Sequence, residues 1–304
     1  MKISTKMMRM IPVCQGRFSR VPTSSSKLLL GILGVTLLAL AACLDLGPIK
    51  EYAALSKQAS AGYSGIVEDM YQSCLRSAEY DPPANGDTPE THCAEWKAVQ
   101  PGLLHAEATL QDYLVALGKL AGDDKISYDK NIDALKKECE GLKIGGNAVF
   151  TSTQADAISG IAGFLVKAAT ADYRRRELAR TISAQNENVK TVTTALKDIV
   201  GHDYETRLQN EQIAVEAFQV RLERASDQSL AVEIGKREAR HRLLDIQQKK
   251  EAADSYVKTL DLIAKGHQQL FDNVKNLGSK SLAQSLWDDA TEMAPLLHKI
   301  QKVF

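Results

Sequence analysis

Proline placement is the feature that most restricts what this sequence can fold into, because no proline occurs between Pro101 and Pro295. Proline interrupts the hydrogen-bond ladder of a helix, so its absence over such a length permits long helices. The stretch is dominated by Ala, Leu, Lys, Gln and Glu, which favour helices, and only 6% of the whole chain is aromatic. The sequence therefore predicts an all-α fold.

Apolar residues recur at steps of three and four, as expected for helices with one buried face. The first predicted helix begins at Gly47-Pro48 and runs as one element, with the face Tyr52, Leu55, Ala59, Tyr63, Ile66, Met70 and Cys74. Two later faces are Leu103, Ala106, Leu110, Tyr113, Leu117 and Leu120, and Leu178, Ile182, Val189, Val192, Leu196 and Ile199. The last face has the spacing of a coiled coil. We therefore expect an elongated antiparallel helical bundle with coiled-coil-like long helices.

Capping and turn residues place several boundaries in the first half of the chain. A short helix should open at Thr88-Pro89-Glu90 and reach Trp96, and the next should follow Pro101. The run Thr153–Asp156 resembles a capping box, with Asp in place of the usual Glu. Gly145-Gly146-Asn147 supplies a permissive backbone, so a short extended or hairpin segment is expected there.

Further boundaries follow from the same kinds of residue. Ser127 is expected to cap a helix that reaches Cys139, and Gly201 is expected to break a long helix whose apolar face then continues in a shifted position. Residues 223–232 fit either a turn or a continuing helix. The last helix should open at Ser281 and be kinked or shortened by its proline.

The stretch LLLGILGVTLLALAACLDLG, residues 28–47, follows a flank that carries six Lys and Arg and no acidic residue. A basic flank, an apolar core and then small residues is the order of a secretory signal. The core from Leu28 to Ala42 is shorter than the roughly 20 residues that a membrane-spanning helix needs. We therefore expect a cleaved signal peptide, with an uncut membrane anchor as the alternative.

The junction Leu40-Ala41-Ala42-Cys43 resembles the lipobox of bacterial lipoproteins, a resemblance confined to the leader. It implies lipidation of Cys43: a thioether-linked diacylglycerol, cleavage before the cysteine and acylation of the new amino group. The alternative is a soluble periplasmic protein cut after Ala42. With Leu44 after the cysteine, the resemblance favours the outer membrane over the inner one. The expected organisation is a signal peptide at 1–42, an N-terminal helical region at 43–150 and a long-helix bundle at 151–304, the last two packed together.

The formal charge of zero hides an acidic mature chain. Residues 1–43 hold six Lys and Arg and no acidic residue, which leaves 32 basic and 38 acidic side chains in residues 44–304. A net charge of −6 argues against nucleic acid as a partner. The expected partners are the membrane, through Cys43, and another envelope protein.

Three cysteines follow the leader, and an oxidising envelope favours bridging a pair of them. Cys74 and Cys93 flank the loop-like stretch LRSAEYDPPANGDTPETH, so a disulfide between them is the preferred expectation. Cys93–Cys139, Cys74–Cys139 and no bridge are the alternatives. In each bridged case one cysteine is left over.

No catalytic, cofactor or metal motif is recognisable. The six histidines include no pair at the helical metal-site spacing and no His-Glu-x-x-His motif. The nearest candidate, His202-Asp203-Tyr204-Glu205, is interpreted as a polar break between helices. His267 lies on an apolar face and is expected to be a satisfied core histidine. A concave polar site containing His202, Asp203 and Glu205 would instead favour an enzyme.

Two other stretches allow a structural and a functional interpretation. Arg174-Arg175-Arg176 with Arg180 is either a solvated helix face or a patch for an acidic partner. The apolar run from Ile158 to Ala171 is expected in the bundle core, with membrane insertion as the alternative. The sequence as a whole predicts a non-enzymatic, lipid-anchored envelope protein of scaffold or docking type. The alternative is a periplasmic ligand-binding or sensor bundle.

Overall fold

The computed structural model describes residues 46–60, 62–83, 86–128, 137–171, 173–225 and 229–304. The expected signal peptide and Cys43 lie outside the described residues, and so does most of the helix expected after Ser127. Leu44–Phe304 forms one compact unit, which includes residues on both sides of position 150. This unit is almost entirely helical, so the predicted all-α class is confirmed.

The elements follow one another as α1 (Gly47–Ser60), α2 (Tyr63–Tyr80), α3 (Pro89–His92), α4 (Ala94–Gly122), β1 (Lys143–Ile144), β2 (Asn147–Ala148), α6 (Ser152–Thr170), η1 (Arg175–Glu177), α7 (Leu178–Asp198), η2 (Ile199–Tyr204), α8 (Glu205–Glu223), α9 (Leu230–Asp272) and α10 (Lys280–Val303). The longest, α9, has 43 residues. At 1.5 Å per residue it is about 65 Å long. Helices of this length confirm the bundle expectation.

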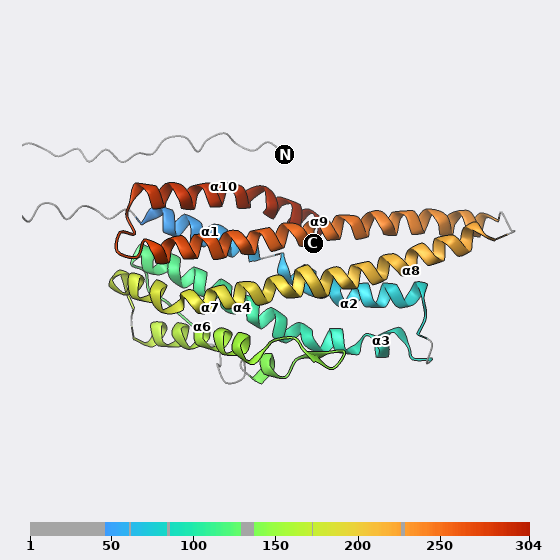
Figure 1. Ribbon diagram of the computed structural model, residues 1–304, viewed down its shortest axis with the longest axis horizontal. Coiled ribbons are helices and arrows are strands. Elements are labelled where there is room, and N and C mark those ends of the chain that lie inside the picture. The colour runs from blue at the N-terminus through green and yellow to red at the C-terminus, as the bar shows by residue number, and fades with distance from the viewer. Residues whose placement is uncertain (1–45, 61, 84–85, 129–136, 172, 226–228) are drawn as a thin grey trace, which may run out of the picture. The chain divides into compact units, whose positions relative to one another are not determined.

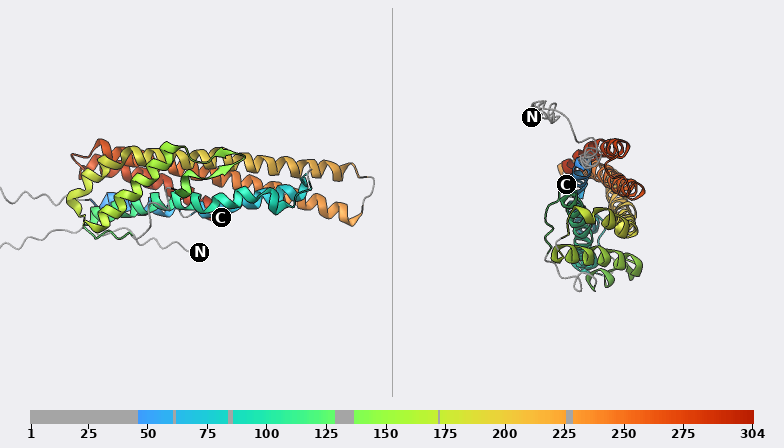
Figure 2. Two further views of the ribbon diagram at one scale, coloured as in Figure 1. Left: turned by 90° about the horizontal axis from the view of Figure 1, so that it is seen from below. Right: turned by 90° about the vertical axis from the view of Figure 1, so that its left-hand side faces the viewer.

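The helices of the 46–304 unit lie roughly side by side along one direction (Figure 1). Helix α9 packs against α7, α8 and α10, while α4 packs against α1, α2 and α6. Figure 2 shows that α8 and α9 run past the end of the other helices and form a two-helix projection. The core follows the predicted apolar faces, with Leu103, Leu110 and Tyr113 buried in α4.

Some predicted boundaries were wrong, and packing explains why. The single helix expected from Gly47 through Cys74 is two helices, α1 and α2. They part beside Gly62, where a β-carbon would collide with Ile300 of α10. Pro101 does not separate two helices, because α4 runs through it between the buried Val99 and Leu103. The short helix expected to reach Trp96 ends at His92.

The capping prediction at Thr153 was also wrong, since the capping box of α6 pairs Thr151 with Gln154. Ser279, not Ser281, caps α10 by accepting a hydrogen bond from the backbone N–H of Leu282. Each error placed the helix start two residues late, because neighbouring Ser and Thr residues compete for the same cap role. Proline inside α10 does not end the helix early.

The hairpin prediction is confirmed. Strands β1 and β2 pair antiparallel, with Ile144 opposite Asn147. Gly145 and Gly146 both have positive φ, +58° and +80°, as a tight two-residue hairpin turn requires. The open choice at residues 223–232 is also settled, because α8 ends at Glu223 and α9 begins at Leu230.

The apolar run in α6 packs into the core. Ile158, Ile161 and Leu165 are buried against the rest of the hydrophobic cluster. Among the described residues, no helix combines the length and apolar character needed to cross a membrane. The core interpretation of Ile158–Ala171 therefore holds for this structure.

Candidate functional site

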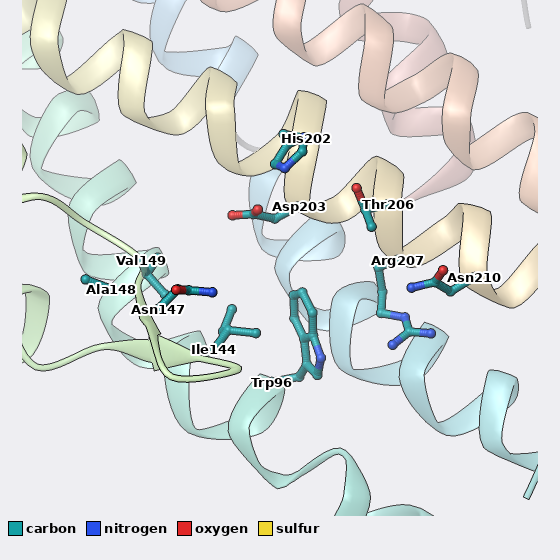
Figure 3. Close-up of a pocket in the computed structure, with 10 residues that line it drawn as sticks. All are labelled: Trp96, Ile144, Asn147, Ala148, Val149, His202, Asp203, Thr206, Arg207 and Asn210. Atoms are coloured by element: carbon teal, nitrogen blue, oxygen red, sulfur yellow. The ribbon is translucent and has the colours of Figure 1, made fainter. Parts of the chain in front are cut away.

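The candidate site is a groove along α8 that is lined in part by polar side chains. Its first cavity has a volume of about 230 Å³ and is bounded by η2, α8, the β1–β2 hairpin and α4 (Figure 3). The side chains that line it are Trp96, Ile144, Asn147, Ala148, Val149, His202, Asp203, Thr206, Arg207 and Asn210. A second cavity of about 480 Å³ shares Arg207 and Asn210 and continues toward Ile213. We call the two together the α8 groove.

The π-helical turn η2 aims the first two polar residues into this groove. It spans Ile199–Tyr204, and its wider turn shifts the buried face by one position. Ile199, Val200 and Tyr204 thereby remain in the core, while His202 and Asp203 project outward. The predicted break at Gly201 was therefore wrong, whereas the predicted shift of the apolar face was right.

The opposite side of the first cavity is the hairpin, which is held against α4. The backbone N–H of Gly145 donates to the Glu95 carboxylate at 2.6 Å, one residue before Trp96. Leu142 packs so closely on Gly102 that a β-carbon there would lie 2.5 Å from a leucine methyl group. Figure 3 shows the Trp96 indole between the hairpin and α8.

The second cavity is bounded by the disulfide. Cys74 and Cys93 are bonded, with Cα atoms 5.8 Å apart, which confirms the preferred pairing over its alternatives. The bridge joins α2 to the start of α4 and brings Cys74, Pro82 and Pro83 beside α8. Cys139 is free and buried, and burial raises the pKa of its thiol to about 12, so it is an inert core residue.

Arg207 lines both cavities of the groove, and its side chain has no hydrogen-bond partner among the described residues. Its guanidinium donates to none of the described residues, and its Nε is shielded from solvent. Burial lowers the pKa of this guanidinium, with Glu211 one turn away acting in the opposite direction. A shielded donor without a partner costs about 1–3 kcal/mol, and native structures contain few of them.

The reason lies in an ion-pair network beneath the groove. Arg76 binds both carboxylate oxygens of Glu211, with its Nε 2.6 Å from one and an Nη 3.0 Å from the other. Arg76 also contacts Asp69, which in turn accepts from Lys249 at 2.9 Å and from the Tyr204 hydroxyl at 2.7 Å. Glu211 and Asp69 are therefore already paired with basic side chains.

Asp245 extends the network, since it pairs with Lys249 and with Arg242, each at 3.0 Å. Three carboxylates therefore meet three cationic side chains. Arg207 is the surplus cation at its edge, because Glu211 is already held by Arg76. Burial alone would raise the pKa of the Asp69 carboxyl, but its hydrogen bonds and ion pairs with Arg76 and Lys249 lower it.

The predicted candidate His202-Asp203-Glu205 is only partly assembled. His202 and Asp203 line the first cavity, whereas Glu205 is exposed and lies outside both cavities. Burial raises the pKa of Asp203, with Asp198 adding to the rise and His202 opposing it. Within the described part of the chain these two side chains share no hydrogen bond or ion pair.

His267 is a satisfied core histidine. Its Nδ1 lies 2.9 Å from Asn186 Oδ1, and its Nε2 lies 2.7 Å from the Tyr113 hydroxyl. The amide oxygen can only accept, so Nδ1 carries the proton and Nε2 accepts from the tyrosine. Burial lowers the pKa of His267 to about 4, which keeps the ring neutral at pH 7.

The basic run Arg174–Arg176, with Arg180, makes the contacts of an ordinary protein surface. The backbone N–H of Arg175 donates to the Asp123 carboxylate, which ties the triplet to the end of α4. Arg176 and Arg180 both lie 3.8 Å from Glu177. These contacts favour the interpretation of Arg174–Arg176 as a solvated, partly paired face.

A second outward surface lies on the projection formed by α8 and α9. We define the α8–α9 arm as residues 213–223 and 230–244. It carries most of the large apolar side chains that are exposed in the described residues, namely Ile213, Val220, Leu230, Ile234 and Leu244. On α9 the positions 230, 234, 237, 241 and 244 are spaced by four and three residues, with Arg237 and His241 between the apolar ones. This spacing is that of a coiled-coil seam, and no helix of the described part of the chain covers its apolar side chains.

Comparisons with other proteins add no assignment to this geometry. No family model, curated protein or solved structure matches the chain. Among the described residues, no group of three or more His, Cys, Asp or Glu side chains could hold a metal ion. Function is therefore argued from the groove, the arm and the leader.

Proposed function

We propose that this protein is a lipid-anchored protein of the bacterial envelope that docks another envelope protein through its α8–α9 arm, without enzymatic activity of its own. The observation that carries the docking role is the exposed seam on α9. Leu230, Ile234 and Leu244 are 77%, 50% and 63% exposed. Side chains of this size are normally covered when they repeat along one helix face.

The spacing of the seam suggests the kind of partner. Steps of four and three residues match the knobs-into-holes packing of an added helix. The partner surface is therefore proposed to be an amphipathic helix, with acidic side chains opposite Arg237 and His241. The tip of the arm extends beyond the other helices, and its base lies beside the end of α2, so such a helix could reach the seam without contacting α1 or α10 (Figure 1).

The proposed anchor is the lipid on Cys43, carried over from the lipobox resemblance. Each buried CH₂ of an acyl chain contributes about 0.8 kcal/mol, so two or three chains hold a protein firmly at a membrane. Confinement to the membrane surface raises the effective concentration of the bundle toward partners in the same membrane. The outer membrane is the proposed location, with the bundle facing the periplasm or the exterior.

Two measurements test the two halves of this proposal. Intact-mass analysis of the protein from native membranes should give a chain that begins at acylated Cys43. An uncut chain, or a cut chain without lipid, would overturn the anchor.

For the arm, a photo-crosslinking residue at Leu244 should capture one envelope protein, and the same residue at exposed Gln301 on α10 serves as the matched control. Equal capture from both positions would overturn the docking role. Capture of a second copy of the chain would assign the seam to self-association instead.

A second candidate function is a periplasmic ligand-binding bundle, and the α8 groove favours it. Binding sites are concave and combine apolar surface with a few convergent polar groups. The first cavity has Trp96 and Ile144 as apolar surface and Asn147, Arg207 and Asn210 as polar groups. This candidate is compatible with the anchor and with the arm, since the groove meets the arm only at its first residues, Ile213 and Ala214, and not at the seam on α9.

A further inference from the structure

We infer that the α8 groove binds a ligand that carries a carboxylate group, and that the guanidinium of Arg207 is the group that recognises it. The inference rests on the second candidate function, the ligand-binding groove, and is independent of the arm and of the anchor. The observation behind it is geometric. The Arg207 guanidinium lies in a cavity, and none of the described residues accepts a hydrogen bond from it.

Carboxylates lie near Arg207, with Glu211 acting on it through space and Asp81 lining the second cavity, but among the described residues none accepts a hydrogen bond from its Nε. Glu211, one turn along the same helix, has both oxygens bound by Arg76 at 2.6 and 3.0 Å. Asp203, one turn in the other direction, points toward the hairpin in Figure 3, while the Arg207 side chain extends past the other side of Trp96. Among the described residues the Nε donor of Arg207 therefore has no acceptor, and the half-buried side chain can meet one from a ligand in the groove.

A carboxylate fits this site better than a phosphate does. A guanidinium presents parallel N–H donors that match the two oxygens of a planar carboxylate. The first cavity holds one permanent positive charge and the carboxyl of Asp203, so a monoanion meets less repulsion there than a dianion does. Asp203 in the same cavity would repel the second negative charge of a phosphate dianion. The amides of Asn147 and Asn210 are available for the ligand's remaining polar atoms.

The surfaces beside Arg207 suggest the rest of the ligand. Trp96 and Ile144 lie on one side, and Pro82 and Ile213 lie on the other, so both directions offer apolar contact. The first cavity, about 230 Å³, is smaller than the roughly 300 Å³ at the lower limit for drug-sized ligands. A single ring with an attached carboxylate is therefore a suitable probe of the site.

The experiment uses the full mature chain labelled with 5-fluorotryptophan. The sequence has two tryptophans, so the fluorine NMR spectrum should contain one signal from the groove and one from Trp287, which is 57% exposed on α10. The Trp287→Phe variant assigns them. Benzoate should shift the Trp96 signal in a saturable way and leave the Trp287 signal in place. Benzamide, its uncharged analogue, and inorganic phosphate are the comparison probes.

Arg207 variants test which group recognises the carboxylate. Charge-assisted hydrogen bonds are worth about 1.5–3 kcal/mol, so Arg207→Gln should weaken benzoate binding about ten-fold or more. Arg207→Lys keeps the charge and loses the fork, and should give an intermediate affinity. Arg176→Gln, on the solvated run before α7, is the matched control and should bind benzoate as the unmodified chain does. Since the Arg207 side chain makes no hydrogen bond to the described residues, its variants should keep the thermal unfolding midpoint.

The outcomes separate this inference from the function on which it rests. Equal shifts with benzamide and benzoate would keep a ligand-binding groove and overturn the carboxylate. Tighter binding of phosphate than of benzoate would overturn it as well. No saturable change at Trp96 with any probe would overturn both the inference and the ligand-binding candidate, while the crosslinking result for the arm would be unaffected.

Discussion

The buried histidine of α9 should make stability depend on pH in a way that a single substitution removes. His267 is 1% exposed, and burial lowers its pKa from 6.5 to about 4. In the unfolded chain the ring takes up a proton as the pH falls through about 6.5, whereas in the folded protein it stays neutral until about pH 4. The unfolded state therefore binds more protons between these values, and folding stability is lost as the pH falls through this window.

The size of the effect follows from the pKa difference. One pKa unit corresponds to about 1.36 kcal/mol, so the full shift amounts to about 3 kcal/mol of unfolding free energy. Integrated from pH 7 down to pH 5, the expected loss from this residue alone is about 2 kcal/mol. At this position the unfolded chain should bind about half a proton more than the folded chain at pH 6.5, and nearly one more by about pH 5.5.

The assay is urea unfolding at several pH values, for the unmodified chain and for His267→Gln. Glutamine can donate to Asn186 and accept from Tyr113, as the histidine does, but it does not titrate. The variant is expected to be less stable at pH 7, because the ring is lost, yet its stability should fall less toward pH 5. Other acidic groups titrate equally in both proteins, so the difference between the two curves isolates His267. Parallel curves would refute the reasoning.

Three further predictions concern the disulfide, the buried ion pairs and a close helix contact. Replacing Cys74 and Cys93 by Ser should lower the free energy of unfolding by about 3 kcal/mol in the chain-entropy model, measured by urea unfolding; no loss would contradict that account. Asp69→Ala should cost about 1–3 kcal/mol, because it removes the acceptor of the buried Tyr204 hydroxyl while Lys249 keeps Asp245 and Arg76 keeps Glu211, and chemical unfolding curves would show a smaller cost if the network were dispensable. Gly266→Ala should lower the thermal midpoint, since a β-carbon there would lie 2.8 Å from Cζ of buried Tyr52; an unchanged midpoint would mean that the tyrosine moves freely.

Local sequence patterns were sufficient for the helices, the hairpin and the disulfide. Apolar steps of three and four require a helix to bury one face, and Gly145-Gly146 admits the positive φ angles of a tight turn. Cys74 and Cys93 lie close in sequence on either side of a loop, so their pairing needed little knowledge of the fold. Helix boundaries were harder, because Gly62 and Pro101 have roles that depend on the neighbouring helices.

The candidate site was only partly visible in the sequence. His202 and Asp203 stood out as polar residues at a change of helix phase, and they do line the groove. Trp96 and Arg207 did not stand out, since each resembles an ordinary residue of an amphipathic helix. The sequence places Glu211 four residues after Arg207, which is the spacing of a helical ion pair. In the structure that carboxylate is bound by Arg76 instead.

The sequence by itself determined that this chain forms long amphipathic helices, because helix formation and the position of a buried face depend on residues within one or two turns. Only the tertiary structure decided which charges remain without partners. Arg76 lies 135 positions before Glu211 in the chain, yet it binds that carboxylate and thereby excludes Arg207. Hydrogen bonds and ion pairs are allocated by distance in space, so the groove and its surplus charge exist only once α2, α4 and α8 are packed together.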